Sequence, residues 1–285
     1  MPDAADLSPP PELGPLHALI ADDAADIRQG LAATIAAFDP LAEVMEAETG
    51  HAALEALSTG RVELAFINVR LPGLTGAEAL AFARTQSVRP LSVLMSRTIM
   101  PRWAEVATEL GAYEFLKKPL DTEHVLQLLR GHGRMRTPAR VLLACASPTA
   151  RQLTHRLLAG TPFTLEIDET DNGQHALKLL RLSPYDLAFI DVALNGIDGL
   201  EACCQARDIS PNTKLVLMSG GEQTLLAQAV RHFGVHAVLT KPFFPRDVNH
   251  VLHGAFGLRR PYLLNAVTAA GAAKTGGVKK ASASR

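Results

Sequence analysis

Five polar residues each follow an apolar run and could together bind a cation and a phosphate. They are Asp22, Asp23, Asn68, Ser96 and Lys118. Carboxylate and amide oxygens are ligands for a hard cation such as Mg²⁺, while a lysine ammonium and a hydroxyl stabilise phosphate oxygens. A set of this kind suits phosphoryl transfer, provided that one carboxylate is free to act as the nucleophile.

A second set of residues stands 123 positions further along the chain, in the same order. Its members are Cys145, Ala146, Asp191, Ser219 and Lys241. The acidic pair of the first set is thus replaced by a thiol and a methyl group. The amide of the first set is replaced by a carboxylate. Each set therefore holds a different part of the residues that the chemistry needs.

The offset of 123 positions also relates whole segments of the chain. Leu64–Ile67 recurs as Leu187–Ile190, and Val93–Ser96 recurs as Val216–Ser219. Identical stretches at one ungapped offset indicate an internal duplication, because two unrelated domains would not keep register over this distance. The sequence therefore predicts two copies of one domain.

The elements that position these residues alternate between strand-like and helix-like patterns. In the first copy the expected strands are His17–Ala21, Val44–Glu48, Val62–Val69, Leu91–Ser96 and Tyr113–Leu116. The expected helices are Asp26–Phe38, His51–Leu57, Ala77–Thr85, Trp103–Leu110 and Asp121–Leu129, the last with Asp121 as N-cap. The second copy repeats this order from Val141 to about Phe256. Such alternation predicts two α/β domains of flavodoxin-like (βα)5 type, with parallel five-stranded sheets of order 2-1-3-4-5.

The chain is expected to divide into five parts. Residues 1–15 form a Pro-rich disordered segment, 16–131 the first domain, 132–139 a linker, 140–257 the second domain and 258–285 a largely disordered tail. The tail is rich in Ala, Gly, Ser and Lys and lacks apolar periodicity.

Composition narrows the class of protein. The formal net charge is -1 and the pI is near 6.8, which predicts no general attraction to nucleic acid or membrane. The 3 cysteines show no C-x-x-C spacing, which favours a reducing compartment over a disulfide framework. We see no signal peptide and no apolar stretch of about 20 residues, so we expect a cytoplasmic protein.

The strand-end residues, including the Lys-Pro steps at Lys118 and Lys241, resemble those of the response-regulator receiver domain, the CheY-like module of two-component signalling. The resemblance covers roughly Leu16–Gly257. It implies an acidic pair that binds Mg²⁺, a phosphoacceptor Asp after the third strand, and a Ser and a Lys that contact the phosphoryl group. It also implies an aromatic switch residue three positions before the Lys, where the two copies have Phe115 and Val238.

Against this pattern the first copy lacks the acceptor. An amide is not a competent nucleophile, so aspartyl phosphate should not form at Asn68. Asp22 and Asp23 could still hold Mg²⁺ weakly, although a salt bridge between this pair and Lys118 is the interpretation that we favour. Phe115 fills the switch position without the hydroxyl of a Tyr.

The second copy has the acceptor candidate Asp191, with Ser219 and Lys241 as phosphoryl-contact candidates. Cys145 and Ala146 are poor ligands for a hard cation. We therefore expect weak Mg²⁺ binding, slow or absent phosphorylation by small donors, and an ion pair between Asp191 and Lys241. A cognate histidine kinase that supplies its own positioning could still phosphorylate Asp191.

Three functional hypotheses follow. The first is a non-enzymatic, atypical tandem receiver without an effector domain after Gly257. It would act by protein–protein contacts with a histidine kinase, a phosphotransfer protein or a downstream target, and it could form a homodimer. The second is a regulator phosphorylated at Asp191, with the first copy as adaptor or dimerisation module. The third is a cyclic-dinucleotide sensor that uses the arginines around the linker, namely Arg130, Arg134, Arg136 and Arg140. Trp103, the only tryptophan, is either an interface residue or a packed helix residue.

Overall fold

The computed structural model describes residues 14–98, 101–220 and 234–263. They fall into two compact units, which we call domain 1 and domain 2. Domain 2 is Arg134–Leu258, and domain 1 contains the described residues before it and those from Arg259 onward.

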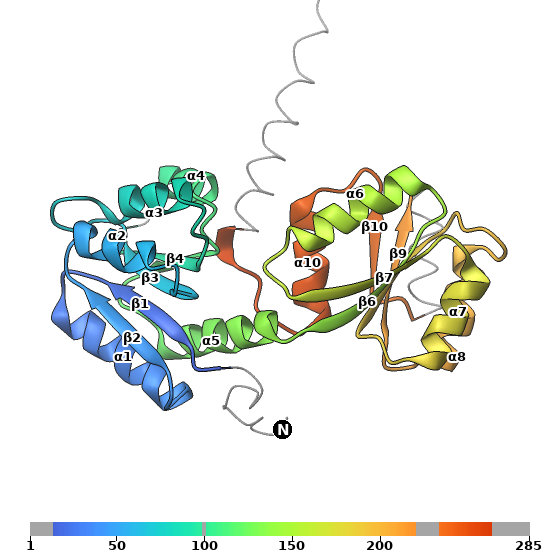
Figure 1. The fold of residues 1–285 in the computed structure, drawn as a ribbon, viewed down its shortest axis with the longest axis horizontal. Helices are drawn as coiled ribbons and strands as arrows, with labels where there is room; N and C mark the ends of the chain where they lie inside the picture. Colours follow the sequence, from blue (N-terminus) through green and yellow to red (C-terminus); the bar gives the residue numbers. More distant parts are fainter. Residues whose placement is uncertain (1–13, 99–100, 221–233, 264–285) are drawn as a thin grey trace, which may run out of the picture. The chain divides into compact units, whose positions relative to one another are not determined.

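Domain 1 is a five-stranded parallel sheet with helices on both faces (Figure 1). Its elements in chain order are β1 (His17–Ala21), α1 (Ala25–Phe38), β2 (Glu43–Ala47), α2 (Gly50–Ser58), β3 (Leu64–Asn68), α3 (Gly76–Thr85), β4 (Leu91–Ser96), α4 (Pro101–Glu109), β5 (Glu114–Lys117) and α5 (Thr122–Arg136). The strand order is β2-β1-β3-β4-β5, as predicted. β2 and β5 are therefore the edge strands.

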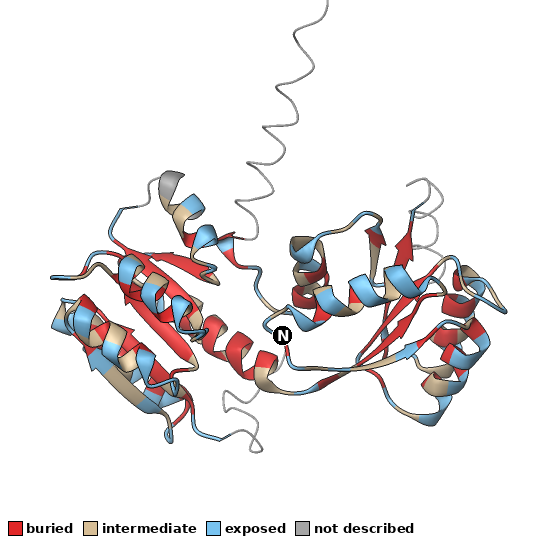
Figure 2. Cartoon of the chain, turned by 45° about the horizontal axis from the view of Figure 1, so that its top comes forward, coloured by how far each residue is buried: buried red, intermediate tan, exposed pale blue. Residues whose placement is uncertain are grey.

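Alternating residues of the central strands fill two apolar layers in domain 1. Leu19 and Ala21 of β1 pack with α2, α3 and α4 on one face of the sheet. Ala18 and Ile20 pack with α1 and α5 on the other face. Because both faces are covered, β3 is buried along its whole length, and the central strands appear as buried in Figure 2.

Domain 2 repeats this architecture with the strand order β7-β6-β8-β9-β10. Its elements are β6 (Ala139–Ala144), α6 (Pro148–Ala159), β7 (Leu165–Thr170), α7 (Gly173–Leu182), β8 (Leu187–Asp191), α8 (Gly199–Ile209), β9 (Lys214–Ser219), β10 (Ala237–Thr240) and α10 (Pro245–Ala255). The predicted flavodoxin-like topology is thus confirmed in both domains.

Helix starts in the two domains follow local capping chemistry. The Thr75 side chain accepts a hydrogen bond from the N–H of Glu78 and forms a capping box at the start of α3. Asp198 caps α8 at the equivalent place. Asp121 Oδ1 accepts from the N–H of Glu123 at 3.1 Å, which confirms it as a cap of α5. These caps fix where the loops that carry the strand-end residues give way to helix.

Two stretches differ from what the sequence suggested. The expected linker 132–139 overlaps with the last turn of α5, which runs to Arg136, and with the first residue of β6. Gly131 and Gly133 both lie within this helix. The segment Arg259–Leu263, expected to belong to a loose tail, is grouped with domain 1. The expected disorder of residues 1–13 and 264–285 lies outside the described residues.

Candidate functional site

The parallel strands of each domain end at one edge of the sheet, and the strand-end residues lie together there. In domain 1, Asp22 follows β1, Asn68 ends β3 and Ser96 ends β4. Asp22 is fully buried, and Asn68 and Ser96 are 8% and 6% exposed. Asp23 is exposed. The strand ends thus bring Asp22, Asn68 and Ser96 to one edge of the sheet, and their role as a phosphoryl site stays a prediction.

Asp22 is occupied by partners inside domain 1. Its Oδ2 forms an ion pair with Lys118 Nζ, and the two side chains are 0% and 5% exposed respectively. Its Oδ1 accepts a hydrogen bond from the N–H of Ala24 at 3.1 Å. A buried ammonium without a counter-charge is strongly disfavoured, so this pair neutralises Lys118 within the pocket. The salt bridge expected from the sequence is present.

Asn68 makes a contact that an aspartate could not make. Its Nδ2 donates a hydrogen bond to Asp23 Oδ1 at 3.0 Å. The amide thereby ties the end of β3 to the loop after β1 and uses one oxygen of the exposed acid. With Asp22 paired to Lys118, the acidic pair fits a strong Mg²⁺ site poorly, because Asp23 Oδ2 is the one oxygen of Asp22 and Asp23 that has no hydrogen bond or ion pair in the described structure.

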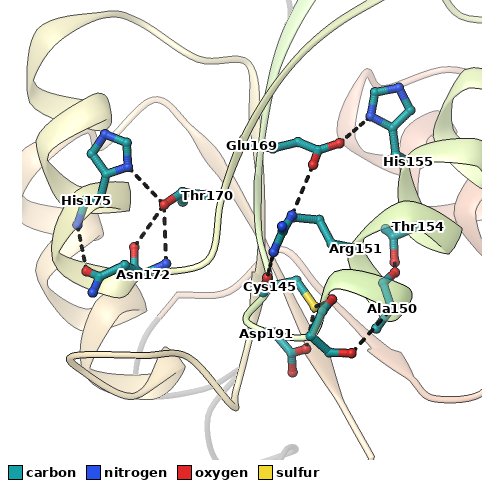
Figure 3. A network of polar contacts seen from close by, with 11 residues as sticks. Cys145, Ala150, Arg151, Thr154, His155, Glu169, Thr170, Asn172, His175 and Asp191 are labelled. Atoms are coloured by element: carbon teal, nitrogen blue, oxygen red, sulfur yellow. Dashed lines mark hydrogen bonds and ion pairs between the residues drawn. The ribbon is translucent and has the colours of Figure 1, made fainter.

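In domain 2 the lysine pairs with the aspartate at the end of the third strand. Lys241 Nζ forms an ion pair with Asp191 Oδ2, with side chains 30% and 5% exposed. Cys145 Sγ donates to the same oxygen at 3.0 Å (Figure 3). Asp191 Oδ1 accepts from the N–H of Ala193 at 3.3 Å. Both oxygens of the acceptor candidate thus have donors, which lowers their nucleophilicity.

The thiol of Cys145 behaves as a neutral donor. Burial, and secondly its hydrogen bond to Asp191, raise the pKa of Cys145 to about 11. The protonated thiol gives no anionic ligand at neutral pH, and Ala146 offers no side-chain ligand at all. Domain 2 therefore does not fit a Mg²⁺ ion held by side chains. Within the described ranges, no group of three or more acidic, His or Cys residues is arranged to hold a metal ion.

The remaining predicted positions lie where the strands place them. Ser96 Oγ accepts from the N–H of Thr98 at 3.3 Å, and Ser219 at the end of β9 is 5% exposed. Phe115 of β5 is 5% exposed and belongs to the apolar layer on the α2–α4 face. Val238 of β10 is only partly buried. The predicted switch position thus holds an inward-packed ring in domain 1 and a smaller aliphatic side chain in domain 2.

The sequence analysis missed an arginine in each domain that holds the end of the first strand. Arg28 Nη1 donates to the Asp22 carbonyl at 2.9 Å, and its Nε donates to Glu46 at 2.9 Å. Arg151 makes the equivalent bonds at the end of β6, at 2.6 Å to the Cys145 carbonyl and 3.1 Å to Glu169, as Figure 3 shows. The signal was available, because each arginine and its glutamate are related by the 123-residue offset.

One glycine in each domain lets the third helix start directly against the acceptor position. A Cβ on Gly76 would lie 2.1 Å from the carbonyl oxygen of Asn68. A Cβ on Gly199 would lie 2.0 Å from the carbonyl oxygen of Asp191. Both distances are too short for any larger residue. Gly76 and Gly199, which are 123 positions apart, therefore allow the same close approach in both domains.

Comparison with known proteins gives the class of the chain. Residues 18–130 and 141–253 each match the response regulator receiver domain family. The chain belongs to this family, and it contains the domain twice. The fold, the strand order and the Lys-Pro step after the fifth strand of each domain agree with this assignment.

Curated relatives match over part of their length. The chain is 34% identical over 82 residues to the transcriptional regulatory protein ResD of Bacillus subtilis, covering 29% of this chain and 34% of ResD. It is 28% identical over 120 residues to the nitrate/nitrite response regulator NarL of Escherichia coli K12, covering 41% and 55%. It is 30% identical over 140 residues to FixJ of Bradyrhizobium diazoefficiens, covering 45% and 66%. The chain thus spans between about a third and two thirds of these relatives.

A tandem fold of this kind has been seen in a crystal structure of a putative two-component system response regulator/GGDEF domain protein. The superposition covers 85% of this chain and 99% of the chain in that crystal structure, with a TM-score of 0.58 and 22% sequence identity. At this identity the likeness concerns the fold alone. None of the helices in the described part of the chain combines the length and hydropathy that crossing a bilayer requires.

Proposed function

We propose that the chain is an atypical receiver pair of two-component signalling that works by protein–protein contact rather than by a Mg²⁺-dependent phosphorylation switch. Receiver domains as a class interact with histidine kinases and other signalling proteins, and this chain has two of them.

The observation that carries the proposal is the pairing of each lysine. Lys118 is neutralised by Asp22, and Lys241 is neutralised by Asp191, in both cases inside the same pocket. In domain 1 the acids that could bind a cation have no acceptor beside them. In domain 2 the acceptor candidate has no acidic pair beside it, and its oxygens bind a thiol, an ammonium and a backbone N–H. Neither pocket therefore combines a cation with a free carboxylate nucleophile.

The test is mass spectrometry of the full chain after incubation with Mg²⁺ and a small acyl phosphate. We expect no phosphoryl adduct on the wild type. Asn68→Asp, which completes the acidic set of domain 1, is the positive control and should acquire an adduct at position 68. A wild-type adduct at Asp191 that disappears in Asp191→Asn would overturn the proposal.

The second candidate is phosphorylation of Asp191 by a cognate kinase. It is favoured by the placement of Asp191, Ser219 and Lys241 at neighbouring strand ends, two of which are joined by an ion pair. Phosphotransfer from purified candidate kinases to the wild type but not to Asp191→Asn would establish it. Absence of transfer from every kinase that phosphorylates the Asn68→Asp control would remove it.

Cyclic-dinucleotide sensing is less well supported. Arg130 pairs with Glu123 at 3.1 Å, and Arg134 pairs with Asp186 at 3.5 Å and stacks on Phe256. Arg140 pairs with Asp168 at 2.9 Å and lies over the ring of Tyr185. Because these guanidinium groups already have carboxylate or aromatic partners within their own domains, a phosphate would have to displace them.

A further inference from the structure

The described end of the chain packs onto domain 1. Leu263 is 5% exposed and belongs to the same apolar layer as Phe115 and Ala107, against which Trp103 also packs. Pro261 is buried as well, whereas Tyr262 between them is 44% exposed. The chain is helical at Tyr262 and Leu263, and these two neighbours face the solvent and the domain respectively.

Glu114 holds the backbone of this segment. It begins the edge strand β5 and is 1% exposed. The N–H of Tyr262 donates to Glu114 Oε1 at 2.9 Å and to Oε2 at 3.0 Å. Oε1 also accepts from the N–H of Phe115 at 2.8 Å. Because β5 pairs only with β4, this carboxylate serves an N–H at the free edge of the sheet and joins it to the arriving segment.

The surroundings of Glu114 explain why a buried acid is tolerated there. His124 of α5 lies 3.7 Å away, and the positive charge of Arg259 stabilises the carboxylate. Burial nevertheless raises the pKa of Glu114, so its ionised form depends on Arg259 and on the N–H groups of Phe115 and Tyr262. The equivalent position of domain 2 is Ala237, so this arrangement belongs to domain 1 alone.

We propose that the β5 edge of domain 1 is a peptide-binding surface and that its occupant is the chain's own segment Arg259–Leu263, which we call the strap. Glu114 binds the strap backbone through the Tyr262 N–H, and the apolar layer around Phe115 takes the Leu263 side chain. The strap holds Phe115, the switch position, in its inward place.

The strap restricts which partners can bind the β5 edge of domain 1. The carboxylate and the Leu263 site can accept only one segment at a time. Any other chain that pairs with the β5 edge of domain 1 must first displace the strap. The strap is covalently attached, so its effective concentration at the surface is on the order of millimolar, and it excludes weak competitors.

Two neighbouring substitutions in the full chain form a matched test. Leu263→Ser removes the inward side chain, and Tyr262→Ser changes the outward side chain while keeping the backbone N–H. Trp103 is the single tryptophan and reports on domain 1 alone. We expect Leu263→Ser to shift Trp103 emission to the red and to speed amide exchange at Tyr262 and Phe115 about tenfold or more. Tyr262→Ser should leave both readouts at the wild-type value.

Rescue in trans separates a binding surface from ordinary core packing. A synthetic peptide with the sequence of residues 258–263 should, at millimolar concentration, restore Trp103 emission and Phe115 amide protection in Leu263→Ser. The same peptide carrying Ser in place of Leu263 should not. Slow amides of β1 and β3 check that the variant is folded. Equal effects of the two serine variants, or no rescue by the peptide in a folded variant, would overturn the proposal.

Discussion

Replacing Asn68 by Asp should turn domain 1 into a Mg²⁺-responsive domain. The present amide donates to Asp23 Oδ1 at 3.0 Å. The substitution replaces this hydrogen bond by two like charges at about the same distance. Their Coulomb repulsion is about 1 kcal/mol at the dielectric constant of water and about 5 kcal/mol at an effective value of 20. Because Asp23 is exposed, we expect a loss near the lower end, about 1–2 kcal/mol without divalent cation.

Magnesium should reverse that loss in the variant only. A cation bound with a dissociation constant of about 1 mM stabilises the folded state by about 1.4 kcal/mol at roughly 10 mM. For a domain of this size this corresponds to a rise in Tm of about 4–8 °C. The assay is thermal unfolding followed by Trp103 fluorescence, with and without MgCl₂, for the wild type and Asn68→Asp.

The control is Asp23→Asn in the Asn68→Asp background, which removes the repulsion and should cancel both the loss and the Mg²⁺ response. If the wild type gains as much from Mg²⁺ as Asn68→Asp does, its acid pair binds the cation without the acceptor. The conclusion that the pocket is incomplete would then be refuted.

Three further outcomes follow from the described contacts. Burial raises the pKa of Cys145 to about 11, so at pH 8 a thiol alkylating reagent should modify the exposed Cys204 well before Cys145, as peptide mass mapping would show. Arg28→Met should destabilise domain 1 by about 2 kcal/mol in denaturant unfolding, because it leaves the Asp22 carbonyl and two glutamates without their donor. Burial also raises the pKa of Glu114, so the folded state binds this proton more tightly than the unfolded state does. The difference in unfolding free energy between the wild type and Glu114→Gln should therefore shift in favour of the wild type as the pH falls from 7 toward 4.5. It should shift back as the pH rises again.

The fold could be predicted from the sequence because the repeat and the strand-end residues are local patterns. Each strand ends at a polar residue, and parallel strands bring those ends to one edge, so the pocket could be assembled without coordinates. The ion pairs of Lys118 and Lys241 also followed, since a buried lysine needs a counter-charge and each pocket offered few.

Other features depend on tertiary packing that no local pattern shows. The expected helix ended at Leu129, yet α5 continues through Gly131 and Gly133 to Arg136, although glycine in a helix interior costs about 1 kcal/mol relative to alanine. Close packing does not explain either glycine, because a Cβ at each position would meet nothing within 4 Å. The strap has too few apolar residues to be noticed in sequence, and its contact with Glu114 joins positions 148 residues apart.

The retention of one aspartate with each lysine follows from burial energetics without any role for a cation. In domain 1 the Lys118–Asp22 pair is almost fully buried, whereas the Lys241 side chain of domain 2 is 30% exposed. Removing one partner of a buried pair costs about 3–5 kcal/mol, because the other charge is left without compensation, and replacing both by apolar residues is often close to neutral. Lys118→Met should therefore cost about 3 kcal/mol or more, and adding Asp22→Leu should recover most of it. Lys241→Met should cost less, about 1–2 kcal/mol, since water can reach the site. Native-state hydrogen exchange, which reports each domain by its own slowest amides, measures all three variants in the full chain. Equal costs for the two lysine substitutions, or no recovery in the double variant, would mean that the pairs are not held by burial and that the pockets have kept these residues for some other reason.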